Sequence, residues 1–99
     1  MQLSFTAPMW QWAARQGDAW WFVTLPPEES DVLADIPLPP RGFGSVRVRV
    51  TVGATTWQTS VFPSKEHEAF ILPMKKTVRR AENLGPDTLV EVTLTPVDV

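Results

Sequence analysis

The chain has 99 residues, of which 43% are hydrophobic and 20% are charged, and it contains no cysteine. A chain of this length has room for one core, so we expect a single domain over residues 1–99 that is held together by packing, without disulfides or thiolate chemistry. The absence of cysteine suits a reducing cytoplasm, and no apolar run is long enough to cross a bilayer, so we expect a cytoplasmic protein. The net charge of −2 argues against binding to nucleic acid through overall charge.

The first expected strand covers residues 3–12, and its apolar residues do not all fall on one face. Its alternation places the apolar side chains up to Met9 on one face, whereas Trp10 and Trp12 fall on the opposite, polar face. Because proline within a strand commonly coincides with a β-bulge, we expect an irregularity near Pro8 that resets the alternation and buries both indoles. The alternative is that the indoles line a groove covered by a ligand or a partner.

A second strand and a short helix are expected next. The aromatic and β-branched run at residues 19–25 predicts a central strand. Residues 26–29 then place prolines and glutamates where a helix begins, since both are favourable in a first turn. Val32, Leu33 and Ile36 form the expected apolar stripe of this helix, which ends at the proline-rich segment that follows.

The clearest prediction is a β-hairpin in the middle of the chain. Residues 46–52 alternate strictly between valine and polar side chains, which indicates a strand with one buried face. Residues 53–54 predict a tight turn into a second strand over residues 55–62, in which Trp57 has the parity of a core residue. A short apolar strand at residues 69–72 follows.

The main helix is expected over residues 74–84. Met74, Val78 and Ala81 recur at helical spacing and predict its apolar face. Gly85 is expected to end the helix, because glycine suits the left-handed conformation and the proline after it cannot continue the helix.

A closing strand is expected over residues 88–95. Together these elements predict a mainly β fold, namely a small closed or partly open antiparallel barrel of about six strands with one or two short helices. Closure is expected because a half-open sheet of this size would expose hydrophobic edges.

Three segments carry a resemblance to a known family. They are residues 41–46 (RGFGSV), 56–65 (TWQTSVFPSK) and 72–80 (LPMKKTVRR). In this order and spacing they resemble the family of domains of unknown function called DUF1905. The resemblance covers nearly the whole chain and implies a small bacterial β-barrel domain with no established reaction. The ending over residues 72–94 is also distantly similar to the swapped-hairpin barrels of transition-state regulators and antitoxins, many of which bind DNA as dimers.

Charge is segmented along the chain, because residues 1–40, 41–80 and 81–99 carry net charges of −4, +6 and −4. Our leading hypothesis is a non-enzymatic binding or interaction module with a basic helix–strand surface. The cations expected to form this surface are Arg41, Lys75, Lys76, Arg79 and Arg80, with Arg47 and Arg49 on the neighbouring strand. A solvated helix face is the simpler interpretation of the same charges, because cations are favourable near a helix C-terminus. The expected partners are another protein or a second copy of the chain bound through an aromatic strand.

Two further functions remain open. The likeness to the regulator barrels favours nucleic-acid binding through the basic helix, and a pocket lined by Trp57, Phe62 and Lys65 would make the chain a small-ligand-binding or enzymatic domain. His67 is the only histidine and is expected to be a solvated loop residue. Because no acid is clearly placed to orient it and its neighbouring carboxylates cannot surround a metal ion, we expect no catalytic residues, no metal and no cofactor.

Overall fold

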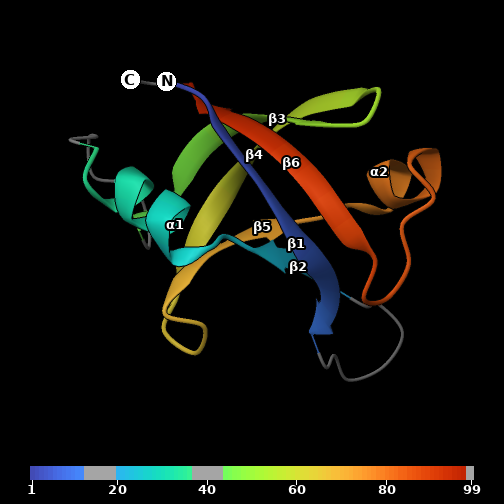
Figure 1. Cartoon of the computed structure of the whole chain (residues 1–99), viewed down its shortest axis with the longest axis horizontal. Helices are drawn as coiled ribbons and strands as arrows, with labels where there is room; N and C mark the ends of the chain where they lie inside the picture. Colours follow the sequence, from blue (N-terminus) through green and yellow to red (C-terminus); the bar gives the residue numbers. More distant parts are fainter. Residues whose placement is uncertain (13–19, 37–43, 98–99) are drawn as a thin grey trace.

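The structure is a computed structural model that describes residues 1–12, 20–36 and 44–97. Within these ranges six antiparallel strands close into a barrel in the order β1-β2-β5-β4-β3-β6 (Figure 1). The strands are β1 (Leu3–Trp12), β2 (Trp20–Thr24), β3 (Val46–Val52), β4 (Thr55–Ser64), β5 (Ala69–Pro73) and β6 (Leu89–Pro96). There are also two short helices: α1 (Pro27–Ala34) follows β2, and α2 (Lys76–Ala81) follows β5. The predicted fold class is therefore confirmed.

Strand β1 joins two parts of the barrel because it changes partner along its length. Its first part pairs with β6, from Leu3 opposite Leu94 to Pro8 opposite Leu89, and its last four residues pair with β2. Pro8 lies where the partner changes, and the register runs on without an extra residue. The expected bulge is therefore wrong, and the indole of Trp10 projects outward. The antiparallel pairing with β6 also brings the start of β1 and the end of β6 to the same end of the barrel (Figure 1).

The interior of the barrel is filled by the alternating apolar positions of the strands. The four valines of β3 are all buried, as their alternation predicts. Val50 lies between Trp57 of β4 and Leu94 of β6, its direct partners on the two neighbouring strands. Trp57 is only 9% exposed, so its predicted place in the core is confirmed.

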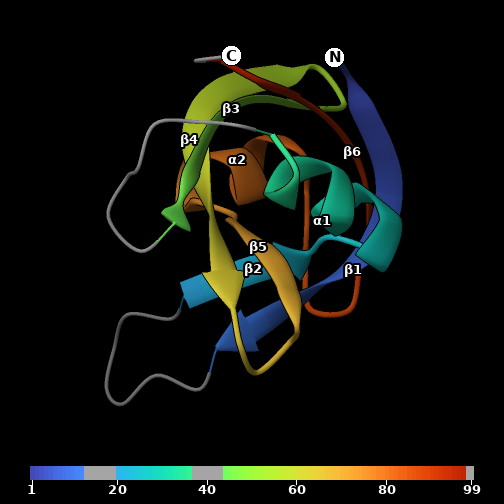
Figure 2. The same cartoon turned by 90° about the vertical axis from the view of Figure 1, so that its left-hand side faces the viewer.

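Helix α1 packs over the open end of the barrel with a narrower apolar face than expected (Figure 2). Leu33 is 1% exposed and belongs to the core, whereas Val32 is 38% exposed. Ser30 is also buried, and its hydroxyl oxygen accepts a 2.7 Å hydrogen bond from the backbone N–H of Phe70 at the start of β5. The helix is thus attached to the sheet by one leucine and one buried hydrogen bond, and the predicted stripe is wrong at Val32.

Helix α2 is shorter than the helix expected over residues 74–84, and it ends differently. The N–H of Leu84 donates to the carbonyl of Arg79 and the N–H of Asn83 donates to that of Arg80, which is the Schellman arrangement. The left-handed position is taken by Asn83, with φ 59°, and not by Gly85. Asparagine tolerates this conformation better than most residues because its side chain hydrogen-bonds locally. Neither helix of the described ranges is long and apolar enough to cross a membrane.

Candidate functional site

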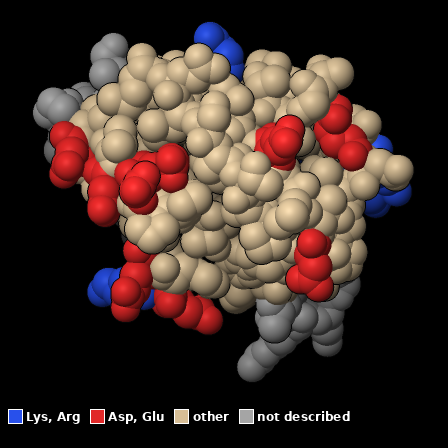
Figure 3. Space-filling view, viewed as in Figure 1, with Lys and Arg blue, Asp and Glu red and all other residues tan. Residues whose placement is uncertain are grey.

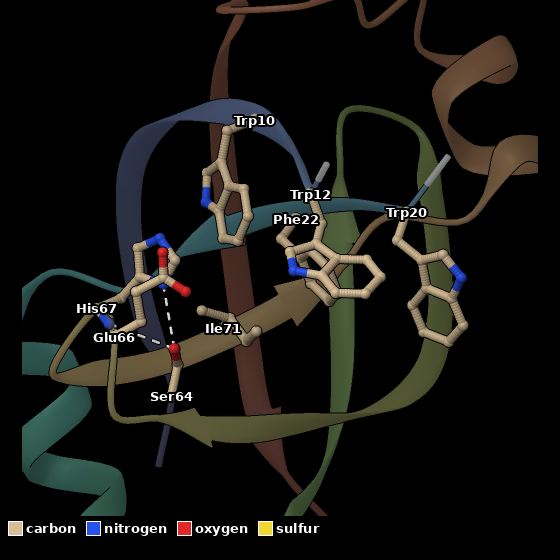
Figure 4. A pocket seen from close by; sticks show the side chains of 8 residues that line it. All are labelled: Trp10, Trp12, Trp20, Phe22, Ser64, Glu66, His67 and Ile71. Atoms are coloured by element: carbon tan, nitrogen blue, oxygen red, sulfur yellow. Dashed lines mark hydrogen bonds between the residues drawn. The ribbon is translucent and has the colours of Figure 1, made fainter. Parts of the chain in front are cut away.

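Four aromatic rings gather on the outer face of β1 and β2. Antiparallel pairing sets Trp10 directly opposite Phe22 and Trp12 directly opposite Trp20. Because directly opposed residues project from the same face of a sheet, all four rings leave the barrel wall on one side. They surround a hollow of about 410 Å³, here called the aromatic hollow (Figure 4). It is lined by Trp10, Trp12, Trp20, Phe22, Ser64, Glu66, His67 and Ile71.

Contacts within the hollow hold Trp10, Phe22 and Trp20 in place. The indole N–H of Trp10 donates a 2.8 Å hydrogen bond to the hydroxyl oxygen of Thr24. The ring centroid of Phe22 lies 5.1 Å from that of Trp10 and 6.1 Å from that of Trp20. Trp12 and Trp20 nevertheless remain 52% and 56% exposed, at the open side of the hollow. Trp10 and Trp12 therefore line a groove, which was the alternative to the expected burial of both indoles.

The turn between β4 and β5 forms the polar rim of the hollow. His67 is half-buried and stacks on the indole of Trp10, with ring centroids 4.4 Å apart. The hydroxyl oxygen of Ser64 lies 3.1 Å from Nδ1 of His67 and accepts a 3.3 Å hydrogen bond from the backbone N–H of the same residue. The prediction of a solvated loop histidine is therefore wrong, because both the turn geometry and the stacking fix the imidazole against the aromatic wall.

The polar groups of the lining are few, and Ser64 and His67 contact each other. In a nucleophilic triad a carboxylate orients the histidine, but the interactions described for His67 are those with Ser64 and Trp10. Ser64 is held within a local turn of the kind that serine commonly forms with a backbone N–H nearby. Among the described residues, no three histidine, aspartate or glutamate side chains are placed to hold a metal ion. The lining therefore offers ring faces, one carboxylate and a hydrogen-bonding rim.

The four cations predicted on the main helix separate into two kinds. Lys75, Lys76 and Arg80 are exposed. Arg79 is half-buried, with its guanidinium carbon 5.5 Å from the ring centroid of Trp21 and its Nε donating a 3.0 Å hydrogen bond to the carbonyl oxygen of Met74. Arg79 therefore stabilises the attachment of α2 to the barrel, whereas the other three cations contact solvent.

The other cations predicted to contribute to binding do not belong to α2, and of these Arg47 and Arg49 are exposed on β3. The face shown in Figure 3 carries more acidic than basic side chains, and the basic ones stand apart from one another at its edges. Lys65 belongs to the β4–β5 turn, which Figure 1 shows well away from α2. Arg41 lies outside the described residues.

The predicted pocket of Trp57, Phe62 and Lys65 is not assembled. Trp57 and Phe62 are five positions apart on β4, and an odd separation in a strand places side chains on opposite faces. Trp57 accordingly points into the core, while Phe62 is 39% exposed on the outside. None of the three residues lines the aromatic hollow.

Comparison with known proteins places the chain in a family. No curated protein matches the sequence. The sequence model of the DUF1905 family, described as a domain of unknown function, matches residues 5–94 and so spans nearly the whole barrel. The matched segment includes every described residue that lines the aromatic hollow. The resemblance inferred from the sequence is confirmed, and the chain belongs to the DUF1905 family.

Proposed function

We propose that this protein is a non-enzymatic binding module that holds a small organic ligand in the aromatic hollow. The observation that carries the proposal is the set of four aromatic rings on one outward face, two of them more than half exposed to solvent. Exposed apolar surface that is gathered into one place commonly marks a binding site, because each ring left in water forgoes the stabilisation of burial.

The dimensions and the rigidity of the hollow support a ligand of small size. Its volume of about 410 Å³ falls within the range typical of small-molecule sites, roughly 300–1,000 Å³. Trp10 is fixed by a hydrogen bond to Thr24 on one side and by stacking with His67 on the other. Because Trp10 is ordered before a ligand arrives, binding does not have to restrict its ring, which favours affinity.

A thermal-shift screen tests the proposal. The probes are quaternary ammonium ions, aromatic amines, nucleosides and simple sugars, each added at millimolar concentration. We expect at least one class to raise the melting temperature, since a ligand that binds only the folded state stabilises it. The shift should be lost in Trp12→Ala, whose removal takes one ring from the open side of the hollow and should weaken binding by about 10-fold or more.

Leu89→Ala is the matched control, because Leu89 is also an exposed apolar residue, 68% exposed, but does not line the aromatic hollow. This variant should retain the shift of the unaltered protein. A uniformly flat screen would contradict the proposal. A mass that rises with concentration in light scattering, and that returns to the monomer value in Trp12→Ala, would also contradict it by assigning the hollow to a second copy of the chain.

A second candidate function is nucleic-acid binding through the exposed cations of α2. It is supported by the exposure of Lys75 and Lys76 at the start of α2 and of Arg80 in its last turn. The triple replacement of these residues by glutamate should abolish retardation of duplex DNA in a gel at low salt, and retardation by the unaltered protein should fall steeply as salt is added. Arg79 is kept in this variant because it packs on Trp21. Absence of retardation by the unaltered protein at low salt would exclude this function.

A further inference from the structure

We propose that the aromatic hollow selects an organic cation, and specifically a methylated ammonium group. This inference rests on the proposed function and adds to it the chemical class of the ligand. It follows from the juxtaposition of four aromatic rings with the carboxylate of Glu66 in a lining that contains no lysine or arginine within the described residues.

The electrostatics of the lining favour positive charge. The face of an aromatic ring carries the negative part of its quadrupole and attracts a cation, with tryptophan the strongest of the natural rings. Three of the four rings here are indoles. Glu66 is exposed, and it is the one aspartate or glutamate of the described lining. A phosphate or carboxylate group would be repelled by Glu66 and by the ring faces, so the described part of the lining disfavours anions.

The arrangement in space lets both kinds of group act on one ligand. Figure 4 shows Glu66, Ser64 and His67 on one side of the hollow, with Trp12 and Trp20 on the other. Ile71 lies between the two sides, on the floor formed by β5. A cationic group seated on Ile71 would therefore have indole faces on one flank and a carboxylate on the other.

The scarcity of hydrogen-bonding groups favours methylated over unmethylated ammonium. Ring faces and the Ile71 side chain cannot accept the three N–H bonds of a primary ammonium, so that group would lose much of its hydration without replacement. A trimethylammonium group has no N–H to satisfy and presents methyl groups to the rings. The same scarcity disfavours sugars, whose many hydroxyls would find the Ser64 hydroxyl already engaged with His67.

The decisive experiment compares choline with its uncharged carbon isostere, in which a tert-butyl group replaces the trimethylammonium group. The two probes have nearly the same shape, so a difference in affinity reports the charge. Binding is measured by the change in tryptophan fluorescence and checked by calorimetry. We expect choline to bind about 10-fold or more tightly than the isostere.

Variants of the two neighbouring glutamates separate the role of the carboxylate from general effects of charge. Glu66→Gln should weaken choline binding several-fold and leave the isostere unchanged. Glu68→Gln is the control, because Glu68 belongs to the same turn and is exposed but does not line the hollow. It should leave both affinities unaltered.

The possible failures are distinguishable. Equal affinities for choline and the isostere, both reduced in Trp12→Ala, would overturn the selection for a cation while supporting the hollow as a binding site. Absence of binding by either probe up to high millimolar concentration would overturn the inference, and the thermal-shift screen would then decide the proposed function by itself. Equal losses in Glu66→Gln and Glu68→Gln would contradict a specific role for Glu66.

Discussion

Replacing Leu33 by alanine is expected to lower the free energy of unfolding by about 2–5 kcal/mol, the usual cost of removing a buried leucine side chain from a core that cannot collapse around the gap. Leu33 is 1% exposed and is the buried apolar side chain through which α1 joins the core cluster. Its loss would leave the helix attached mainly through the hydrogen bond between Phe70 and Ser30. Urea denaturation followed by tryptophan fluorescence measures the change.

The adjacent residue provides the control for this prediction. Val32 is 38% exposed on the same helix, so Val32→Ala should change the free energy of unfolding by no more than about 0.5 kcal/mol. Both substitutions introduce alanine, the best helix former, so a loss of stability in the Leu33 variant cannot be attributed to helix propensity. Similar small effects of the two substitutions would show that α1 does not contribute to the core in the way described.

Replacing Gly53 by alanine is expected to cost about 2–4 kcal/mol, from backbone strain together with the loss of a charge-assisted hydrogen bond. Gly53 begins the β3–β4 turn with φ 58°, a conformation that residues with a Cβ rarely adopt. The carboxylate of Glu82, just after α2, lies over this glycine and accepts a 2.6 Å hydrogen bond from the hydroxyl of Thr55. An added methyl group would lie 2.8 Å from the carboxylate carbon and would displace it.

A second glycine separates strain from steric overlap. Gly44 has φ 73°, but a methyl group there would meet only the Cγ of Pro63 at 3.5 Å, an ordinary contact. Gly44→Ala should therefore cost about 1 kcal/mol, from strain alone. In a Glu82→Ala background, Gly53→Ala should become less costly, since the overlapping group is gone. Equal costs for the two glycine substitutions in the unaltered background would rule out the proposed overlap.

Much of the fold could be predicted from the sequence because the interior of a small barrel imposes a period of two. The alternation along β3 and β4 shows that the valines and Trp57 face the same side of their sheet as the other apolar residues, and this side is the core. The closing of the sheet follows from the exposed edges that an open one would leave. These features depend on local alternation, which is visible without knowledge of which strands are neighbours.

The aromatic hollow depends on strand pairing, and the sequence does not reveal it directly. A proline in β1 suggested a bulge, but Pro8 lies where β1 passes from one partner to the next, so the alternation survives. The tryptophans of outward parity, Trp10 and Trp12, were the available indication of a surface site. Their meeting with Trp20 and the approach of His67 from another turn require the three-dimensional arrangement.

The pairing of Leu3 with Leu94 has a practical consequence for the experiments on ligands. The start of β1 and the end of β6 lie at one end of the barrel, while β1 runs from that end toward Trp12 at the other (Figure 1). A strand of ten residues extends on the order of 30 Å, so a tag at either end stands well clear of the indoles. The molecule can thus be attached to a sensor chip through a tag at either end, with the aromatic hollow facing the solution.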